Sequence, residues 1–392
     1  MGNDMPRRFS NCLNTGKIRN ITCKEELRAG QGMDREKRMR AWIRAEVMLL
    51  FIMMGAFLLR ETGRTESMEQ AVVTATSAAG KDYIKWVDFG VTSEAMNQAF
   101  RLDVDTCQAD VHLNWVELLA YLGAKYGGDF EWFRQADLDA VTEKLKSGMT
   151  MEELTKDMKY YAYYREAYGA VLDGMVGYFE QETEAPEDLT QSGTGENGNA
   201  KTVWLRKYGL KAFSPIAKNF PYSDFDDFGA SRSYGFKRKH LGHDMMGQVG
   251  TPIIAVESGY VEALGWNQYG GWRIGIRSFD KKRYYYYAHL RKNYPFQSNL
   301  KEGSAVQAGD VIGYMGRTGY SSKENTNNIE ESHLHFGLEL VFDESQKESD
   351  HEIWINCYEL VKFLRRNQCE TVKVEGTKEW RRVYQTKDVP TA

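Results

Sequence analysis

The order of apolar and polar residues divides this chain into segments of different character. Near the N-terminus, the uninterrupted apolar run Val47–Leu59 follows a basic segment, and a helical pattern comes later. A polar stretch then separates that pattern from short apolar runs that alternate with glycines, such as "WRIGIRSF" and "HLHFGLELVF". Because helical periods and short alternating runs belong to different secondary structures, the chain is expected to be multi-domain.

The apolar run near the N-terminus predicts a membrane anchor at residues 41–60, in which Arg44 can extend its charge to the membrane surface. The basic run "REKRMRAWIR" predicts that residues 1–40 are cytoplasmic and that the rest of the chain is extracytoplasmic, in the cell envelope. The following "RETGRTES" lacks a small-residue cleavage site, which favours an uncleaved single-pass anchor in the cell membrane over a signal peptide. A buried core helix is the alternative.

Residues 61–180 are expected to form an α-helical region. Asn114 stands at an N-cap position before "WVELLAYLGAKY", and Gly127 follows where a helix ends. Thr150 and Glu153 have the spacing of a capping box, which predicts a long helix after them. The tyrosines of this stretch are expected to pack in a core or an interface, with a sugar-stacking surface as the alternative. They are Tyr160, Tyr161, Tyr163, Tyr164, Tyr168 and Tyr178.

The second half of the chain begins with a change of composition. Residues 181–202 are acidic and then rich in glycine, serine and asparagine, which predicts a flexible linker. Over residues 203–346, runs rich in β-branched and aromatic residues are separated by glycines, which predicts an all-β domain. Residues 347–392 are expected to hold a helix within "WINCYELVKFLRR" and an irregular tail after Asn367.

Charge and cysteine content exclude two classes of function. The formal net charge is −4 over 392 residues, so no broad basic field exists for nucleic acid, and no nucleic-acid partner is expected. The five cysteines are scattered and none forms a CxxC pair, which argues against a cysteine-bound zinc. Cys357 and Cys369 are close enough in sequence to pair if this part of the chain is exported.

Two of the seven histidines lie one residue apart in "ESHLHFGLEL". In a β-strand, His333 and His335 share one face, while Leu334, Phe336 and Leu338 share the other. An isolated pair of this kind is compatible with solvated or hydrogen-bonded histidines on an exposed strand. The other histidines of the chain decide whether this pair belongs to such an exposed strand or to a functional site.

The segment "HLGHD" supplies further candidates. In an extended chain, His240 and Asp244 point to the same side, and His243 points away from them. Together with one histidine of the pair at 333 and 335, they provide three N and O ligands, which is the usual set of a catalytic zinc site with one open position. The helical HExxH motif is absent from the sequence, so a strand-borne site is predicted.

These motifs resemble those of a known family. "HLGHD", "YAHL" and "HLHF" resemble, in this order, the three histidine motifs of the lysostaphin-type (LytM-type) zinc endopeptidases, which cut peptide cross-links in bacterial peptidoglycan. The glycine-rich segments "GTPIIAVESGYVEALGW" and "EGSAVQAGDVIGYMGRTG" resemble the same family. The resemblance covers about Arg238 to Leu340 and leaves the helical region unassigned.

The resemblance implies a fold, a cofactor and a reaction. The fold is an all-β domain of antiparallel sheets with a groove, and one Zn²⁺ per catalytic domain is implied. Zinc-bound water would hydrolyse peptide bonds in peptidoglycan stem peptides or cross-links, which makes the peptidoglycan peptide the expected partner. By this resemblance the zinc ligands are His240, Asp244 and His335, and the catalytic residues are His289 and His333. No site role is expected for His112, His243 or His351.

One departure from the family pattern concerns specificity. Between Gly319 and His333 this chain has the long polar segment "YSSKENTNNIEES", where the family usually has a short turn. A loop in this place borders the final histidines, so it is expected to change substrate preference and not the ligand set. Two alternatives to a peptidoglycan hydrolase are a non-hydrolytic binding or activator module of the same fold and a zinc peptidase that acts on a protein.

Overall fold

The computed structural model describes residues 84, 87–185, 202–234, 236–347, 349 and 351–389, which all belong to one unit, Met68–Ala392. The predicted cytoplasmic segment 1–40 and the predicted anchor 41–60 lie outside the described residues. In the described part of the chain, no helix combines the length and apolar character needed to cross a membrane.

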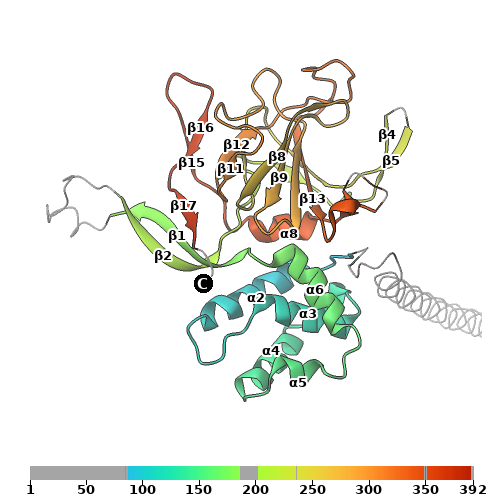
Figure 1. Ribbon diagram of the computed structural model, residues 1–392, viewed down its shortest axis with the longest axis vertical. Helices are drawn as coiled ribbons and strands as arrows, with labels where there is room; N and C mark the ends of the chain where they lie inside the picture. Colours follow the sequence, from blue (N-terminus) through green and yellow to red (C-terminus); the bar gives the residue numbers. More distant parts are fainter. Residues whose placement is uncertain are drawn as a thin grey trace, which may run out of the picture. The chain divides into compact units, whose positions relative to one another are not determined.

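The helical region precedes the β strands in the chain (Figure 1). The helix Trp115–Tyr126 begins and ends where the local signals predict: the Asn114 side chain accepts hydrogen bonds from the N–H groups of Val116 and Glu117, and Gly127 closes the helix with φ 61°. The helices are α2 (Ser93–Thr106), α3 (Trp115–Tyr126), the 3₁₀ helix η1 (Phe130–Trp132), α4 (Gln135–Lys146), α5 (Met151–Thr155) and α6 (Tyr161–Leu172).

The capping box at Thr150 and Glu153 is confirmed, but the long helix expected after it is wrong. The helix ends at Thr155. The Thr155 hydroxyl donates to the Met151 carbonyl, and the Thr155 carbonyl accepts a hydrogen bond from the N–H of Met158, three residues later. Such side-chain bonds to the preceding turn compete with helix continuation. Of the tyrosines expected to pack, Tyr164 and Tyr168 are fully buried, whereas Tyr178 is exposed on a strand.

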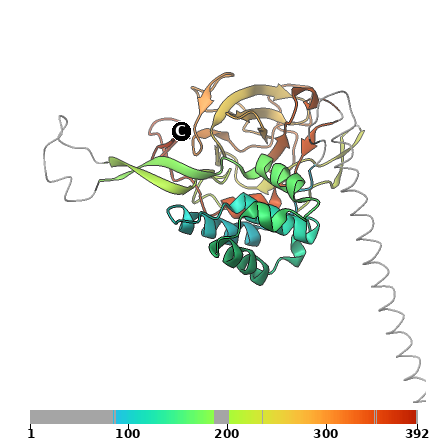
Figure 2. The same ribbon diagram turned by 60° about the horizontal axis from the view of Figure 1, so that its bottom comes forward.

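A hairpin occupies the ends of the predicted linker. Strands β1 (Val176–Glu184) and β2 (Thr202–Leu210) form nine antiparallel pairs, and β17 (Thr386–Asp388) adds a third strand to β1. Residues 176–180 therefore differ from the expected helical region, and residues 181–184 and 202 differ from the expected linker, because ladder hydrogen bonds do not require apolar side chains. Residues 186–201 lie outside the described part. The hairpin extends away from the rest of the unit (Figure 2).

The main sheet has eight strands in antiparallel pairs, in the order β11-β8-β9-β10-β13-β6-β3, with β14 also paired to β13. At its centre, His335 of β13 lies opposite Asp244 of β6 on one side and Ala288 of β10 on the other. The strands are β3 (Ser223–Asp224), β6 (His243–Met246), β8 (Gly259–Asn267), β9 (Gly271–Ser278), β10 (Arg283–Ala288), β11 (Ala305–Val306), β13 (His333–Leu340) and β14 (Ile353–Trp354). The antiparallel all-β architecture expected for this region is confirmed.

Smaller elements complete the described unit. Three two-stranded sheets and two helical segments are present: β4 (Ser231–Tyr234) with β5 (Phe236–Lys239), β7 (Pro252–Ile254) with β12 (Val311–Tyr314), β15 (Thr371–Lys373) with β16 (Trp380–Arg382), η2 (Glu344–Gln346) and α8 (Tyr358–Leu364). The helix expected near the C-terminus is thus confirmed as α8, but the irregular tail is wrong, since β15, β16 and β17 lie in it. Cys357 and Cys369 are both free thiols.

The helical region and the main sheet share one hydrophobic core. Helix α8 lies between them (Figure 1), and its Phe363 stacks on Trp115 of α3 with ring centroids 5.6 Å apart. Arg283 at the start of β10 donates a 2.9 Å hydrogen bond to the Ala170 carbonyl of α6. The helical region therefore packs directly on the β domain, on the side where β13 presents Leu334 and Phe336.

Candidate active site

The first part of the site is a tight connection between two strands. Strand β5 ends at Lys239 and β6 begins at His243, so the "HLGHD" segment bends over the middle of β13. A Cβ atom at Gly242 would lie 2.5 Å from Cε1 and 2.6 Å from Nε2 of His335. Only glycine fits at this position, because the His335 ring packs against its backbone.

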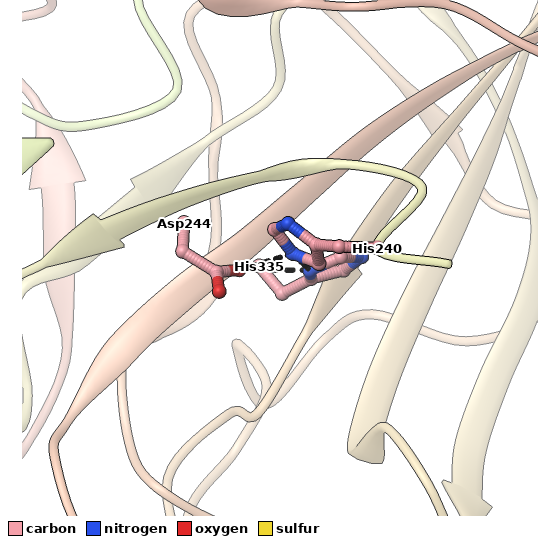
Figure 3. Close-up of side chains that lie close together, drawn as sticks. All are labelled: His240, Asp244 and His335. Atoms are coloured by element: carbon pink, nitrogen blue, oxygen red, sulfur yellow. Dashed lines mark hydrogen bonds and ion pairs between the residues drawn. The ribbon is translucent and has the colours of Figure 1, made fainter. Parts of the chain in front are cut away.

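Three side chains converge at this bend (Figure 3). Nε2 of His240 lies 3.0 Å from Oδ1 of Asp244 and 3.0 Å from Nδ1 of His335, and the last two atoms are 2.8 Å apart. The three residues offer one ligand atom each, close enough to bind a common metal ion. His240 and Asp244 thus lie on the same side, as the period of an extended chain predicted. The period alone left open whether His333 or His335 would join them.

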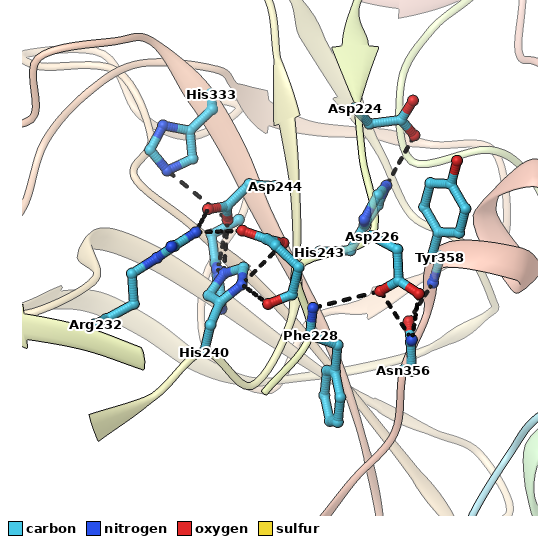
Figure 4. A network of polar contacts seen from close by, with 12 residues as sticks. Asp224, Asp226, Phe228, Arg232, His240, His243, Asp244, His333, Asn356 and Tyr358 are labelled. Carbon is cyan, nitrogen blue, oxygen red and sulfur yellow. Dashed lines mark hydrogen bonds and ion pairs between the residues drawn. The ribbon is translucent and has the colours of Figure 1, made fainter. Parts of the chain in front are cut away.

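A second layer of charged groups orients the cluster (Figure 4). The Asp227 carboxylate lies 3.1 Å from Nδ1 of His240, on the side of the ring that faces away from Asp244. The Arg232 guanidinium pairs with Asp227 and also lies 3.7 Å from Oδ2 of Asp244. A carboxylate behind a ligating histidine fixes the tautomer and orientation of the ring.

Two further histidines lie beside the cluster. Nδ1–H of His289 donates to the Thr318 carbonyl at 2.9 Å, and Nδ1–H of His333 donates to the Glu331 carbonyl at 2.9 Å. Since a carbonyl can only accept, each Nδ1 carries a proton, and in the neutral form of each ring Nε2 is then the acceptor. The two rings are 4.8 Å apart, and Nε2 of His333 lies 3.9 Å from Asp244.

Burial and neighbouring charges set the protonation states. Burial alone would raise the pKa of Asp244, but hydrogen bonds from His240 and His335 hold it well below its ordinary value, so the carboxylate is ionised. Burial and the nearby His333 and His335 lower the pKa of His289 well below its ordinary value. Burial also lowers the pKa of His335, against the opposing effect of Asp244. His289 is therefore neutral.

A pocket opens over these groups and includes residues that the sequence analysis missed. Besides the histidines and Asp244, it is lined by Arg232, Ser233, Arg238, Tyr269, Gly270, Tyr286, Ala288 and Tyr320. The even spacing of Arg238 and His240 is the same period-two signal that grouped His240 with Asp244, and it could have indicated Arg238. Tyr320 begins the long polar segment after Gly319 that was expected to border the site, but no local signal distinguishes it from the other residues of that loop.

Comparison with known families decides the class of this domain. Residues 238–348 match the model described as Peptidase family M23. The β domain belongs to peptidase family M23. The motifs that carried the resemblance to lysostaphin-type enzymes lie within the matched residues, so that resemblance is confirmed.

Individual relatives are similar over the M23 domain. The chain is 38% identical over 130 residues to an L-Ala–D-Glu endopeptidase of Bacillus subtilis, which covers 33% of this chain and 38% of that protein. It is 39% identical over 98 residues to lysostaphin of Staphylococcus staphylolyticus, covering 25% of this chain and 18% of that protein. The solved catalytic domain of lysostaphin from Staphylococcus simulans aligns at 30% identity and a TM-score of 0.28, over 36% of this chain and 92% of that one. The chain thus spans well under half the length of these two curated relatives.

The remaining histidines lie away from the M23 pocket. His243 is buried, and its Nε2 is 2.9 Å from Asp224 on the opposite side of β6. His112 pairs at 3.0 Å with Asp103 in the helical region. His351 is exposed. These positions agree with the structural or surface roles expected for all three.

Proposed function

We propose that this protein is a zinc-dependent endopeptidase that hydrolyses peptide bonds in the stem peptides or cross-links of bacterial peptidoglycan. The observation that carries the proposal is the convergence of His240, Asp244 and His335 beside two further histidines, His289 and His333. The names of the similar proteins support the substrate class, since they include an L-Ala–D-Glu endopeptidase and a glycyl-glycine endopeptidase.

The donor set fits zinc. Two imidazole nitrogens and one ionised carboxylate oxygen match the three-ligand formula of catalytic zinc sites, which keep a fourth position open. The Asp227 carboxylate beside His240 is the outer partner that such histidines usually have. The free thiols Cys357 and Cys369 are buried and are not part of the cluster, so a cysteine-bound metal is not favoured.

The chain's own residues supply the proton transfers. When bound, zinc would polarise the scissile carbonyl and lower the pKa of a water molecule to about 7. Both His289 and His333 line the pocket, and with Nδ1 bonded to a carbonyl the neutral form of each ring presents Nε2 as its proton acceptor. One accepts the proton of the attacking water, and an imidazole that has gained a proton then donates it to the leaving amine or to the developing oxyanion.

Cleavage assays with a metal control test this proposal. The full-length protein, loaded with zinc, is incubated with purified peptidoglycan, and the released fragments are identified by mass spectrometry. We expect new peptide termini that disappear after chelation, return when zinc is added, and are absent with His335→Ala. Zinc-loaded protein that releases no peptide fragment from walls of several cross-link chemistries would contradict the proposal.

We also propose that the M23 domain acts outside the cytoplasm, since its substrate is there. The basic flank and apolar run at 41–60 motivate this location. Protease added to intact, wall-stripped cells should degrade the M23 domain and spare residues 1–40. Full protection of the chain would reverse the assignment.

A further inference from the structure

Two arginines of one hairpin face the M23 pocket. Arg232 on β4 and Arg238 on β5 are directly opposite each other in the antiparallel ladder, so their side chains project from the same face of the hairpin. Both are partly buried, whereas Lys237 and Lys239 are exposed. Like charges directly opposite each other on a strand pair are unfavourable. This arrangement therefore requires compensating negative charge.

Only one of the two arginines has that compensation. Arg232 pairs with the Asp227 carboxylate and lies near Asp244. Among the described residues, no carboxylate lies within ion-pair distance of Arg238, and Asp244 is the single acidic residue that lines the pocket. The Nε atom of Arg238 is shielded from solvent and has no hydrogen-bond partner in the structure. Leaving a charged donor unsatisfied in this way is costly.

Tyr320 holds the Arg238 guanidinium at the pocket. The guanidinium lies over the Tyr320 ring, 5.1 Å from its centroid, and donates a hydrogen bond to the Tyr320 hydroxyl. The Tyr320 ring is also 5.8 Å from the ring of His289. Tyr320 has φ 46°, an uncommon value for a residue with a large side chain, and Asn328 of the same loop donates to its carbonyl at 2.6 Å. Strained residues of this kind often belong to binding sites.

We propose that Arg238, placed by Tyr320, binds a carboxylate of the substrate peptide next to the cleaved bond. This inference rests on the proposed function and narrows its substrate class to peptides with a free acid beside that bond, as opposed to uncharged glycine bridges. A guanidinium fork matches a carboxylate with two parallel hydrogen bonds. The one carboxylate that lines the pocket among the described residues, Asp244, is bonded to His240 and His335 and lies outside ion-pair distance of Arg238. Arg238 is thus a specificity-determining residue, and its charge is not required for the bond-breaking step itself.

A pair of matched peptides tests this inference on the full-length, zinc-loaded protein. Both contain an L-Ala–D-Glu bond, and the free carboxylate of the D-Glu is either left as the acid or converted to the amide. We expect the wild type to cleave the acid with a kcat/KM about 10- to 100-fold above that of the amide, the range of one charged hydrogen-bonded pair. Arg238→Gln should remove this preference by raising KM for the acid, and Arg238→Lys should keep part of it. Arg381→Gln, which changes an exposed arginine of β16, should retain the full preference.

A binding measurement separates failure of this inference from failure of the proposed function. The affinity of the product peptide that begins with D-Glu, as acid and as amide, is measured by calorimetry, which needs no cleavage. If the wild type binds the acid more tightly than the amide and Arg238→Gln abolishes this difference, the inference is supported even when no peptide is cut. The absence of cleavage would then count against the proposed activity alone. Equal affinities in the wild type, or an equal loss for acid and amide in Arg238→Gln, would overturn it. Cleavage of a glycine oligomer as fast as the acid peptide would overturn it as well.

Discussion

The two faces of strand β13 differ in what they contact. Leu334, Phe336 and Leu338 are fully buried and belong to the core that the β domain shares with the helical region. His333 and His335, on the other face, line the pocket beneath the β4–β5 hairpin. Alternate residues of one strand therefore serve stability and chemistry separately, because successive side chains project to opposite sides of a sheet. Substitutions on the two faces are expected to have separable effects.

The largest effect is expected on the pocket face, at His335. His335→Ala leaves two protein ligands, so zinc occupancy should fall, and activity should fall with it by roughly 10³-fold or more. The matched control is His243→Ala, which removes a histidine of adjacent strand β6 that points away from the pocket and pairs with Asp224. This control should lose some stability and keep its zinc.

Metal analysis beside a peptidoglycan cleavage assay checks both variants. Zinc content is expressed per folded molecule, so that a loss of stability is not counted as a loss of the site. If His243→Ala lost zinc while His335→Ala retained it, the assignment of the metal site to the side of the strands that carries His335 would be wrong.

A smaller effect is expected at the two histidines outside the ligand cluster. His289→Ala and His333→Ala should each lower the rate by roughly 10² to 10⁴, the usual range for a positioned acid–base group, and leave most zinc in place. Their Nδ1 atoms are held by backbone carbonyls, so each ring is oriented without the metal. Metal content and kcat, measured on the same preparations, distinguish this result from ligand loss. Loss of zinc equal to that of His335→Ala would assign them to the ligand set.

Local sequence signals predicted the parts of this molecule that depend on local geometry. The caps at Asn114 and Thr150 follow from side chains that reach backbone groups within three residues, and the structure has both. The shared face of His333 and His335 follows from the period of a strand. The position of Asp244 beside His240 follows from the same period, although the connection between them is not a regular strand.

Contacts between distant segments were not predictable in this way. Asp227 reaches His240 across the β4–β5 hairpin, and Tyr320 reaches Arg238 from a loop far along the chain. No periodic pattern in the sequence indicates that the helical region and the sheet share one core. The pairing of β1 with β2 was hidden by their polar composition, which resembles that of a linker. These features depend on tertiary packing, which overrides composition and local propensity.

On the core face, Leu338→Ala tests stability alone. Leu338 is fully buried opposite Tyr285 of β10, so its truncation leaves a cavity and should lower the free energy of unfolding by about 2–5 kcal/mol. Zinc content and kcat per folded molecule should stay near the wild-type values. Urea unfolding and metal analysis check the two halves of this expectation, and a large fall in kcat of the folded fraction would show that the faces are coupled.

The smallest effect is expected at Glu339, which lies on the pocket face yet is buried. Burial, and then the nearby Glu352 carboxylate, raises its pKa from 4.5 to about 7, and its Oε1 atom has no hydrogen-bond partner in the structure. Between these two pH values the folded protein keeps a proton that the unfolded chain has lost, so the free energy of unfolding falls as pH rises through this window.

Glu339→Gln cannot titrate and should be more stable than the wild type by about 1–3 kcal/mol at pH 8, and nearly equal to it at pH 4. Urea unfolding of both proteins at the two pH values measures this difference. An advantage of the variant that is the same at both pH values would mean that packing, and not the charge of Glu339, accounts for it.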